Sequence, residues 1–287
     1  MNPTTTAFKI DAGTKIGHVA LKVANLAKMT AFYQEVIGLS LLASNEQESL
    51  LGVGQTTLLR LRKITEPLPL TRRTGLYHVA FLLPTRRDLG NALFHYLQVE
   101  APLVGASNHG YSEALYLTDP EGNGIEVYHD KERSQWDIRA DGEIVGVTEP
   151  MDAEGVLGAA DRNWTGFVPE TTVGHVHLKV ADLVASDTFY TEIMGLTLTS
   201  NFGSQAKFFA AGDYHHHLGA NNWLGANVSP MEEHDLGLDY YTYQVPNAAE
   251  LTRLAEHFQE NGVDFKAEPN RLTVIDPNGI VVVVEGE

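Results

Sequence analysis

Four stretches of the chain show the same succession of patterns in their apolar and polar residues, first a strand-like alternation and then a helical spacing. Residues 17–23 alternate between apolar and polar side chains, which predicts a strand with one buried face. The next apolar residues recur at helical spacing, at Met29, Phe32, Tyr33, Val36 and Ile37, and Gly38 is typical of a helix end. Short segments with turn residues follow and predict further strands. Strands of the first kind recur at residues 75–81, from Val173, and at 237–243.

The two halves of the chain repeat each other. The segment IGHVALKVANL, which begins at Ile16, matches VGHVHLKVADL, which begins at Val173, and the offset of their histidines is 175 − 18 = 157 residues. We therefore expect an α+β fold of four βαβββ modules paired into two domains. The expected domains are residues 8–135 and 171–287, joined by a linker at 136–170 with a short helix near 151–160.

Three of the four first strands carry a histidine opposite their apolar face. They are His18, His78 and His175. A single histidine on a strand is more often structural than a ligand. Its recurrence in paired modules favours metal binding, because paired strands can converge on one cleft.

A carboxylate occupies an unusual place after the turn at residues 119–124. Pro120 and the glycines of this turn predict a tight reversal that starts a closing strand. Glu126 lies on that strand between the apolar Ile125 and Val127. A carboxylate among such neighbours is costly unless it is paired or metal-bound. We therefore prefer a ligand role for Glu126 to that of an exposed residue at the rim of a sheet.

The segment from His109 to Glu126 has a specific spacing. The pattern His109-x5-Leu-Tyr116-x2-Asp-Pro-x-Gly-x3-Glu126 resembles the motif of extradiol ring-cleavage dioxygenases. These enzymes belong to the vicinal oxygen chelate superfamily, together with glyoxalase I and the fosfomycin- and bleomycin-resistance proteins. The resemblance extends over nearly the whole chain to the bacterial catechol 2,3-dioxygenase branch.

The resemblance implies a site and a reaction. His18, His78 and Glu126 would be the metal ligands, a 2-His-1-carboxylate set that suits non-haem Fe(II) and leaves coordination positions open. Mn²⁺, Ni²⁺ or Zn²⁺ remain alternatives. His109 would be the acid/base residue, and Tyr116 would hydrogen-bond the bound substrate oxygen. The implied reaction inserts O₂ into a catechol-type aromatic diol and opens the ring beside the diol.

The C-terminal half lacks most of this pattern. At the offset of 157, Val283, Lys266 and Thr273 stand where Glu126, His109 and Tyr116 stand in the first half, and Tyr240 matches His78 by context. We therefore expect a degenerate C-terminal domain that is structural or lines the substrate, although many two-domain relatives carry the metal there.

A second group of histidines lies in the C-terminal half. His215 and His217 are expected on one face of a late strand, where they could form a second metal site with His175. We favour a polar hydrogen-bonded cluster instead, because no carboxylate is evident to complete a ligand set.

Composition narrows the classes of function. The 20 Lys and Arg against 37 Asp and Glu give a net charge of −17, which disfavours nucleic-acid and anionic-membrane partners. The absence of cysteine excludes thiolate zinc sites and cysteine nucleophiles. Residues 1–6 are polar and start no signal peptide, so we expect a cytoplasmic protein. Homo-oligomerisation and the identity of the diol stay open.

Two other functions use the same fold. One is a glyoxalase-like metalloenzyme, an isomerase or a thiol transferase. The other is a non-catalytic protein that binds a drug or aromatic ligand, as bleomycin-resistance proteins do. The presence of His109 with Tyr116 argues against the first, because those reactions do not need this pair of proton donors.

Overall fold

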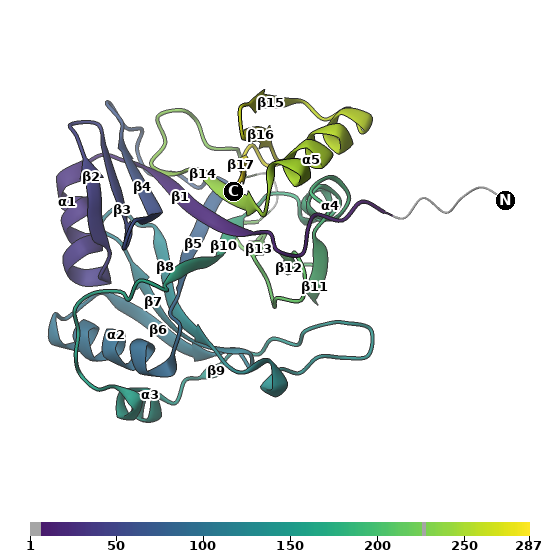
Figure 1. Cartoon of the computed structure of the whole chain (residues 1–287). Helices are drawn as coiled ribbons and strands as arrows, with labels where there is room; N and C mark the ends of the chain where they lie inside the picture. Colours follow the sequence, from purple (N-terminus) through teal and green to yellow (C-terminus); the bar gives the residue numbers. More distant parts are fainter. Residues whose placement is uncertain (1–6, 226–227) are drawn as a thin grey trace.

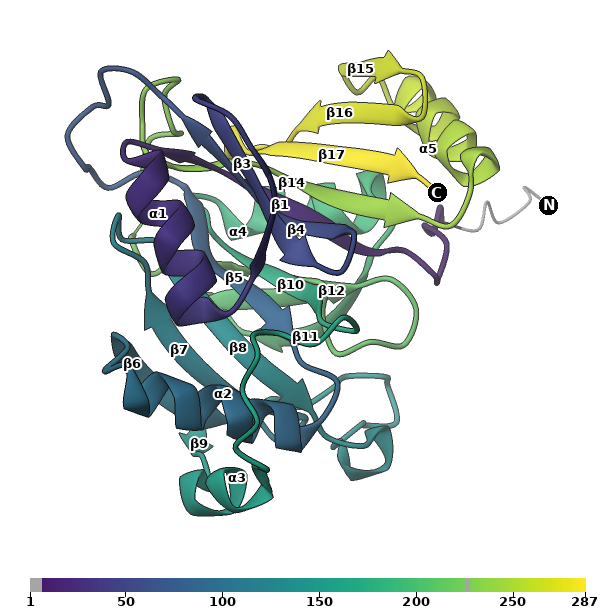
Figure 2. The same cartoon turned by 60° about the vertical axis from the view of Figure 1, so that its left-hand side comes forward.

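The computed structural model describes residues 7–225 and 228–287, so residues 1–6, on which the absence of a signal peptide was argued, lie outside it. The strands form two mixed sheets (Figures 1 and 2). In order across the first sheet they are β15 (Phe265–Glu268), β16 (Arg271–Ile275), β17 (Val281–Gly286), β14 (Gly237–Val245), β1 (Lys15–Val23), β4 (Thr56–Lys63), β3 (Glu48–Val53) and β2 (Ser40–Ser44). Across the second they are β11 (Thr197–Phe202), β12 (Ala206–Ala210), β13 (Leu218–Asn221), β10 (Thr172–Lys179), β5 (Gly75–Leu82), β8 (Gly124–Asp130), β7 (Ser112–Thr118), β6 (Leu103–Asn108) and β9 (Glu149–Pro150).

The helices follow the predicted pattern. They are α1 (Leu26–Phe32), α2 (Arg86–Gln98), α3 (Ala153–Ala159), α4 (Leu183–Thr188) and α5 (Ala248–Glu260). A π-helical turn extends α1 through Tyr33–Ile37, and Gly38 ends it with φ of +106°, as the sequence predicts. The equivalent turn Phe189–Ile193 extends α4, and a 3₁₀ turn spans Arg133–Gln135. The predicted linker helix is α3.

Each sheet joins modules from opposite halves of the chain. The first strands β1 and β14 pair antiparallel in one sheet, and β5 and β10 do so in the other. The first module therefore shares a sheet with the fourth, and the second with the third. This corrects the expected pairing of neighbouring modules: the sheets do not divide into 8–135 and 171–287, which describe the sequence repeat. The repeat alone does not specify which first strands pair, because that choice depends on contacts between distant segments.

A continuous apolar core lies between the helices and the sheets. Helix α1 covers part of the first sheet and α2 covers part of the second (Figure 2). Met29 and Tyr33 of the first module, and Leu89 and Tyr96 of the second, are buried in this core. With the helices on these faces, the opposite face of the second sheet is free to carry polar groups.

A buried aspartate forms the predicted turn in both halves. Asp119 Oδ1 accepts hydrogen bonds from the N–H groups of Glu121 and Asn123, each at 2.9 Å, and the Tyr33 hydroxyl donates to Oδ2 at 2.9 Å. Asp276 has the same arrangement with Tyr190. The turn therefore sets where β8 starts and which face of β8 carries Glu126.

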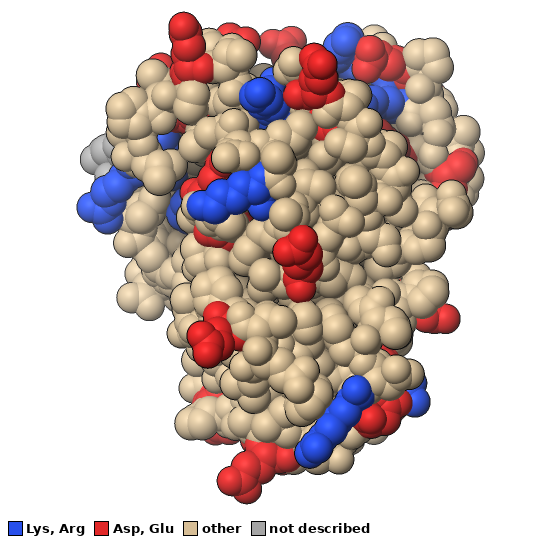
Figure 3. Space-filling model, turned by 90° about the vertical axis from the view of Figure 1, so that its left-hand side faces the viewer, with Lys and Arg blue, Asp and Glu red and all other residues tan. Residues whose placement is uncertain are grey.

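Charges are scattered on the face that carries α1 and α2. Figure 3 shows single acidic and basic side chains spread over a mainly uncharged surface on this side. Among the described residues, no helix has the length and apolar character required to cross a membrane.

Candidate metal centre

Three adjacent strands of the second sheet bring two histidines and a glutamate together. On β5, His78 and Ala80 point to the same face because they are two residues apart. Ala80 lies opposite Glu126 on β8 and opposite His175 on β10. The small Ala80 side chain therefore separates the two larger ones and leaves space above it, and His78 closes the third side of that space.

Two glycines allow β10 and β8 to pack closely against their neighbours at the site. Gly174 is the extra residue of a β-bulge in β10, just before His175. A Cβ there would overlap the Tyr128 hydroxyl. At Gly124, which starts β8, a Cβ would overlap the Tyr77 carbonyl oxygen. The Gly-His pair at 174–175 thus reflects a steric requirement of the site.

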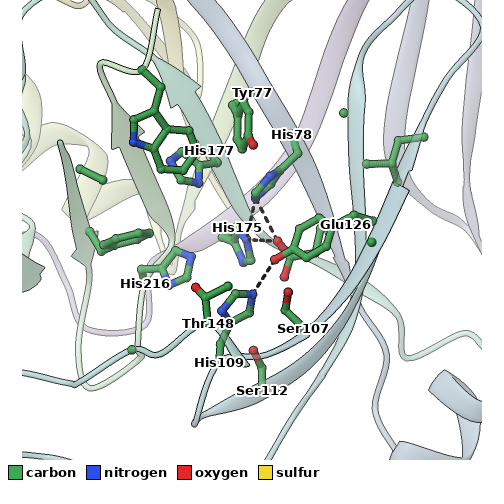
Figure 4. A pocket seen from close by; sticks show the side chains of 18 of the residues that line it. Tyr77, His78, Ser107, His109, Ser112, Glu126, Thr148, His175, His177 and His216 are labelled. Carbon is green, nitrogen blue, oxygen red and sulfur yellow. Dashed lines mark hydrogen bonds and ion pairs between the residues drawn. The ribbon is translucent and has the colours of Figure 1, made fainter. Parts of the chain in front are cut away.

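The three polar side chains converge on one point (Figure 4). His78 Nε2 lies 3.0 Å from Glu126 Oε2, and His175 Nε2 lies 3.3 Å from the same oxygen. The two Nε2 atoms are 3.3 Å apart. All three residues are at most 6% exposed. Among the described residues, this is the group of histidine and acidic side chains whose ligand atoms gather within 4.8 Å.

The electrostatics of the group fit a divalent cation. Burial alone would raise the pKa of Glu126, but His175 and His78 hold it well below its ordinary value. Burial lowers the pKa of His175 to about 4, in spite of the nearby Glu126. The set is therefore a carboxylate and two imidazoles whose nitrogens face one another. Imidazole nitrogens and a carboxylate oxygen are the donors that Fe²⁺, Mn²⁺ and Zn²⁺ accept.

His18 does not reach this group. It lies on β1 in the other sheet, where its Nε2 is 3.3 Å from the Tyr240 hydroxyl. Arg60 donates to that hydroxyl at 3.1 Å, so polar side chains fill the equivalent space. The expected set of His18, His78 and Glu126 is corrected to one in which His175 takes the third place. The reason is the strand pairing: β10, and not β1, lies beside β5.

His109 and Tyr116 form a hydrogen-bonded pair beside the group. His109 Nδ1 lies 2.7 Å from the carbonyl oxygen of Val147, and its Nε2 lies 2.6 Å from the Tyr116 hydroxyl. A carbonyl only accepts, so Nδ1 carries the proton, and in the neutral ring Nε2 accepts from Tyr116. Burial and the charge of Glu126 raise the pKa of Tyr116, which keeps it protonated. The carbonyl that orients His109 belongs to the segment expected to be only a linker.

The three consecutive histidines 215–217 precede β13 and are not part of it. His215 Nε2 lies 2.8 Å from Asp130 Oδ1, and its Nδ1 lies 2.7 Å from His216 Nδ1. His217 Nδ1 accepts the N–H of Ala211 at 3.2 Å. The rings of His215 and His217 both lie beside the Tyr214 ring, with centroids 4.1 and 4.9 Å from its own. Among the described residues, neither histidine joins His175 in the group that could hold a metal.

Sequence reasoning missed His216, which lines the same cavity as His78 and Glu126 (Figure 4). Its ring centroid lies 4.2 Å from that of His175. The carboxylate of Asp130 accepts from His215 Nε2, so in neutral rings His215 Nδ1 accepts and His216 Nδ1 donates. His216 Nε2 is then left as a hydrogen-bond acceptor for the cavity. The signal that could have found it is the run of three histidines itself.

The metal centre opens onto a cavity of about 660 Å³. Besides the histidines, its wall includes the polar side chains of Ser107, Ser112 and Thr148. Figure 4 shows Ser107 and Ser112 near His109 below the centre, Thr148 and His216 to its left and His177 above it. A small ligand in the cavity would therefore meet hydrogen-bonding groups from several directions.

The sequence profile of the Glyoxalase/Bleomycin resistance protein/Dioxygenase superfamily matches residues 15–127 and 172–282. The chain belongs to this superfamily. It is 39% identical over 273 residues to the catechol-2,3-dioxygenase of Bacillus subtilis (strain 168), covering 93% of this chain and 95% of that protein. The chain is thus a dioxygenase-like member of the superfamily.

Solved structures of the superfamily share the fold at low identity. A structure from Bacillus subtilis subsp. subtilis str. 168 superposes with a TM-score of 0.65 at 12% identity, over 97% of this chain and 86% of that one. Glyoxalase I from Zea mays superposes with a TM-score of 0.56 at 16% identity, over 96% and 92%. These structures confirm the predicted α+β arrangement of four βαβββ modules.

Proposed function

We propose that this protein is an Fe(II)-dependent extradiol dioxygenase that cleaves a catechol-type aromatic diol. The observation that carries the proposal is the placement of His78, Glu126 and His175 at the floor of a cavity that also holds the His109–Tyr116 pair. Two histidines and a carboxylate would hold Fe(II) with coordination positions left open, as in non-haem Fe(II) oxygenases. The similarity to a catechol-2,3-dioxygenase supports the same chemistry.

The metal-holding residues would be His78, Glu126 and His175. Bound Fe(II) would lower the pKa of a diol hydroxyl and bring the diol and O₂ together. The three donor residues by themselves do not distinguish Fe(II) from Mn²⁺, Ni²⁺ or Zn²⁺. Iron is favoured because a 2-His-1-carboxylate set in an oxygenase typically holds Fe(II), and the chain is similar to a catechol-2,3-dioxygenase. The neighbouring histidines hold the pKa of Glu126 well below its ordinary value, so this carboxylate would contribute one negative charge to the centre.

The remaining residues handle protons and orientation. With its proton donated to His109, the Tyr116 hydroxyl oxygen is free to accept a hydrogen bond from a diol hydroxyl. His109 Nε2 then receives the proton of Tyr116 as the diol loses its own, and returns it later when the ring opens. His216 Nε2 offers an acceptor on the other side of the centre.

The test is anaerobic loading with Fe(II), followed by O₂ uptake with a panel of catechols. The expected result is one O₂ consumed for each diol, because both oxygen atoms enter the product when the ring bond beside the diol breaks. The product is a ring-opened acid with an aldehyde or ketone group, which mass spectrometry identifies by a gain of two oxygen atoms. An iron-replete protein that consumes no O₂ with any diol would overturn the proposal.

The same experiment separates the alternative functions. A glyoxalase-like isomerase or thiol transferase would turn over its substrate without O₂ consumption. A ligand-sequestering protein would bind aromatic compounds equally well before and after removal of the metal. Binding of the diol that requires the metal, followed by uptake of O₂, distinguishes the proposed dioxygenase from both.

A further inference from the structure

Among the described residues, the Lys179 side chain lines the cavity without a hydrogen-bond or ion-pair partner. Lys179 ends β10, the strand that carries His175 and His177, and all three side chains face the cavity because they are spaced two residues apart. No hydrogen bond or ion pair joins the Lys179 ammonium to any residue that the structure describes. Its neighbours across the strands are Gly75 and Asn221, neither of which carries a charge. Burial lowers the pKa of Lys179.

The sequence repeat provides an internal comparison. Lys22 is the residue equivalent to Lys179 at the offset of 157. Its ammonium donates to the carbonyl oxygens of Glu232 and Glu233 at 2.8 and 3.2 Å. The charges of Asp239 and Asp235 partly offset the lowering of its pKa by burial. The same strand position therefore holds a satisfied structural lysine in one sheet and an unpaired lysine facing the cavity in the other.

Apart from Lys179, this part of the cavity wall combines apolar and aromatic side chains with uncharged polar ones such as Gln205. Trp223 is 52% exposed and its ring centroid lies 5.1 Å from that of Tyr77. Phe202 and Val104 also line the cavity and are partly exposed. Burying a cation in such surroundings is unfavourable unless an opposite charge joins it. Glu126 is the acidic residue of the described wall, and the two histidines engage its carboxylate.

We propose that the aromatic diol carries an anionic substituent, such as a carboxylate, and that Lys179 binds it. This inference rests on the proposed function and specifies its substrate class. The Cα atoms of His175 and Lys179 are four residues apart on a strand, roughly 13 Å. A diol that lies along β10 from the metal centre would bring a chain attached to the far side of its ring toward the ammonium. Lys179 acts as a specificity-determining residue in this arrangement.

Charge balance favours the same substrate. The protein as a whole is strongly acidic, with a net charge of −17, and would repel an anion approaching most of its surface. Inside the cavity, a divalent metal with Glu126 leaves one positive charge, and Lys179 adds a second at the other end. A diol bound as a monoanion with one carboxylate matches these two charges, each anion beside its own cation.

The experiment compares an anionic diol with its neutral ester. The probes are 3-(3,4-dihydroxyphenyl)propanoate and its methyl ester, assayed by O₂ uptake with the iron-loaded protein and its variants. We expect the native protein to prefer the carboxylate in kcat/KM. In Lys179→Met, kcat/KM for the carboxylate should fall about 10- to 100-fold, the range for loss of a hydrogen bond between charged groups. The loss should appear mainly in KM, and the ester should change less than about 2-fold.

Two further variants control for charge and shape. Lys179→Arg keeps the cation and should retain the preference for the carboxylate. Lys15→Met removes one positive charge from an exposed position at the end of β1, where Lys15 pairs with Glu287, and should leave the preference unchanged. Equal use of carboxylate and ester by the native protein, or an equal loss of both in Lys179→Met, would overturn the inference.

Binding measurements separate this inference from the proposed function. Under nitrogen, isothermal titration calorimetry gives the Kd of each probe for the metal-loaded protein without any turnover. If no diol consumes O₂, the dioxygenase proposal fails, and tighter binding of the carboxylate than of the ester that disappears in Lys179→Met would still support an anion site. If diols are cleaved but neither kcat/KM nor Kd distinguishes the two probes, the anion site alone fails.

Discussion

His78 Nε2 and His175 Nε2 lie 3.3 Å apart although 97 residues separate them in the chain. Each comes from a different sequence repeat, and the antiparallel pair β5–β10 brings them together. The metal centre therefore depends on the association of the second and third modules.

The first prediction is that His175→Ala loses the metal and His18→Ala keeps it. Removal of a ligand should weaken metal affinity by more than roughly 100-fold, the upper range for loss of a residue that only supports a ligand. His18 lies in the other sheet and contacts Tyr240, so its removal should leave affinity within about 2-fold. Elemental analysis after anaerobic loading and desalting measures both. Loss of iron from His18→Ala with full occupancy in His175→Ala would contradict the assignment.

The second prediction concerns the pair formed by His109 and Tyr116. Tyr116→Phe removes the hydroxyl that lies 2.6 Å from His109 Nε2 but keeps the ring. We expect kcat to fall about 10²- to 10⁴-fold, the usual contribution of positioned proton transfer, with metal content unchanged. Steady-state O₂ uptake together with iron analysis tests this. The double variant Tyr116→Phe/His109→Gln should be little worse than either single one, and additive losses would show that the two residues act separately.

The third prediction follows the hydrogen bonds from Asp130 through His215 to His216. Asp130→Leu removes the acceptor of the His215 Nε2–H, so the rings lose the bond that sets His216 Nε2 as an acceptor. We expect kcat to fall by about 10-fold or more while metal content is retained. Asp130→Asn should recover most of the activity, because its amide oxygen can accept the same hydrogen bond. An equal loss in both variants would contradict this role and indicate that Asp130 acts through its charge.

Much of this site could be predicted because its residues share one module. His78, His109, Tyr116 and Glu126 lie within 49 residues (from 78 to 126), at positions fixed by local strand and turn patterns. The turn at Asp119 determines which side chains of β8 share a face, so spacing alone was informative. The four βαβββ modules could also be predicted, from the 157-residue repeat and from the strand and helix periodicity of the apolar residues.

The third ligand could not be chosen from local sequence. His18 and His175 stand in the same Gly-His-Val context, and only the pairing of first strands decides which one lies beside β5. That pairing depends on contacts between distant segments. Because the same motif stands in both halves, the motif does not indicate which first strand lies beside β5. His216 was missed for a different reason: the expected second group was built from His215 and His217, and which side of this segment faces the cavity depends on its packing against other strands.

The fourth prediction uses the pKa of His18. Burial, with Arg60 and Arg271, lowers this pKa from 6.5 to about 4. Between these pH values the unfolded chain binds a proton at His18 that the folded protein does not. The native protein should therefore lose stability as pH falls from 6.5 toward 4, with a slope of at most about 1.4 kcal/mol per pH unit from this group.

His18→Gln lacks the titrating ring but can still hydrogen-bond Tyr240, so it is the matched comparison. Urea unfolding of the metal-free native protein and of His18→Gln at pH 7 and pH 5 gives the difference in their free energies of unfolding. The native protein should lose about 2 kcal/mol relative to the variant over this interval. All other titratable groups are the same in both proteins, so their contributions cancel in the difference. A difference that does not change with pH would show that His18 is protonated equally in the folded and unfolded states, which its burial against two guanidinium groups opposes.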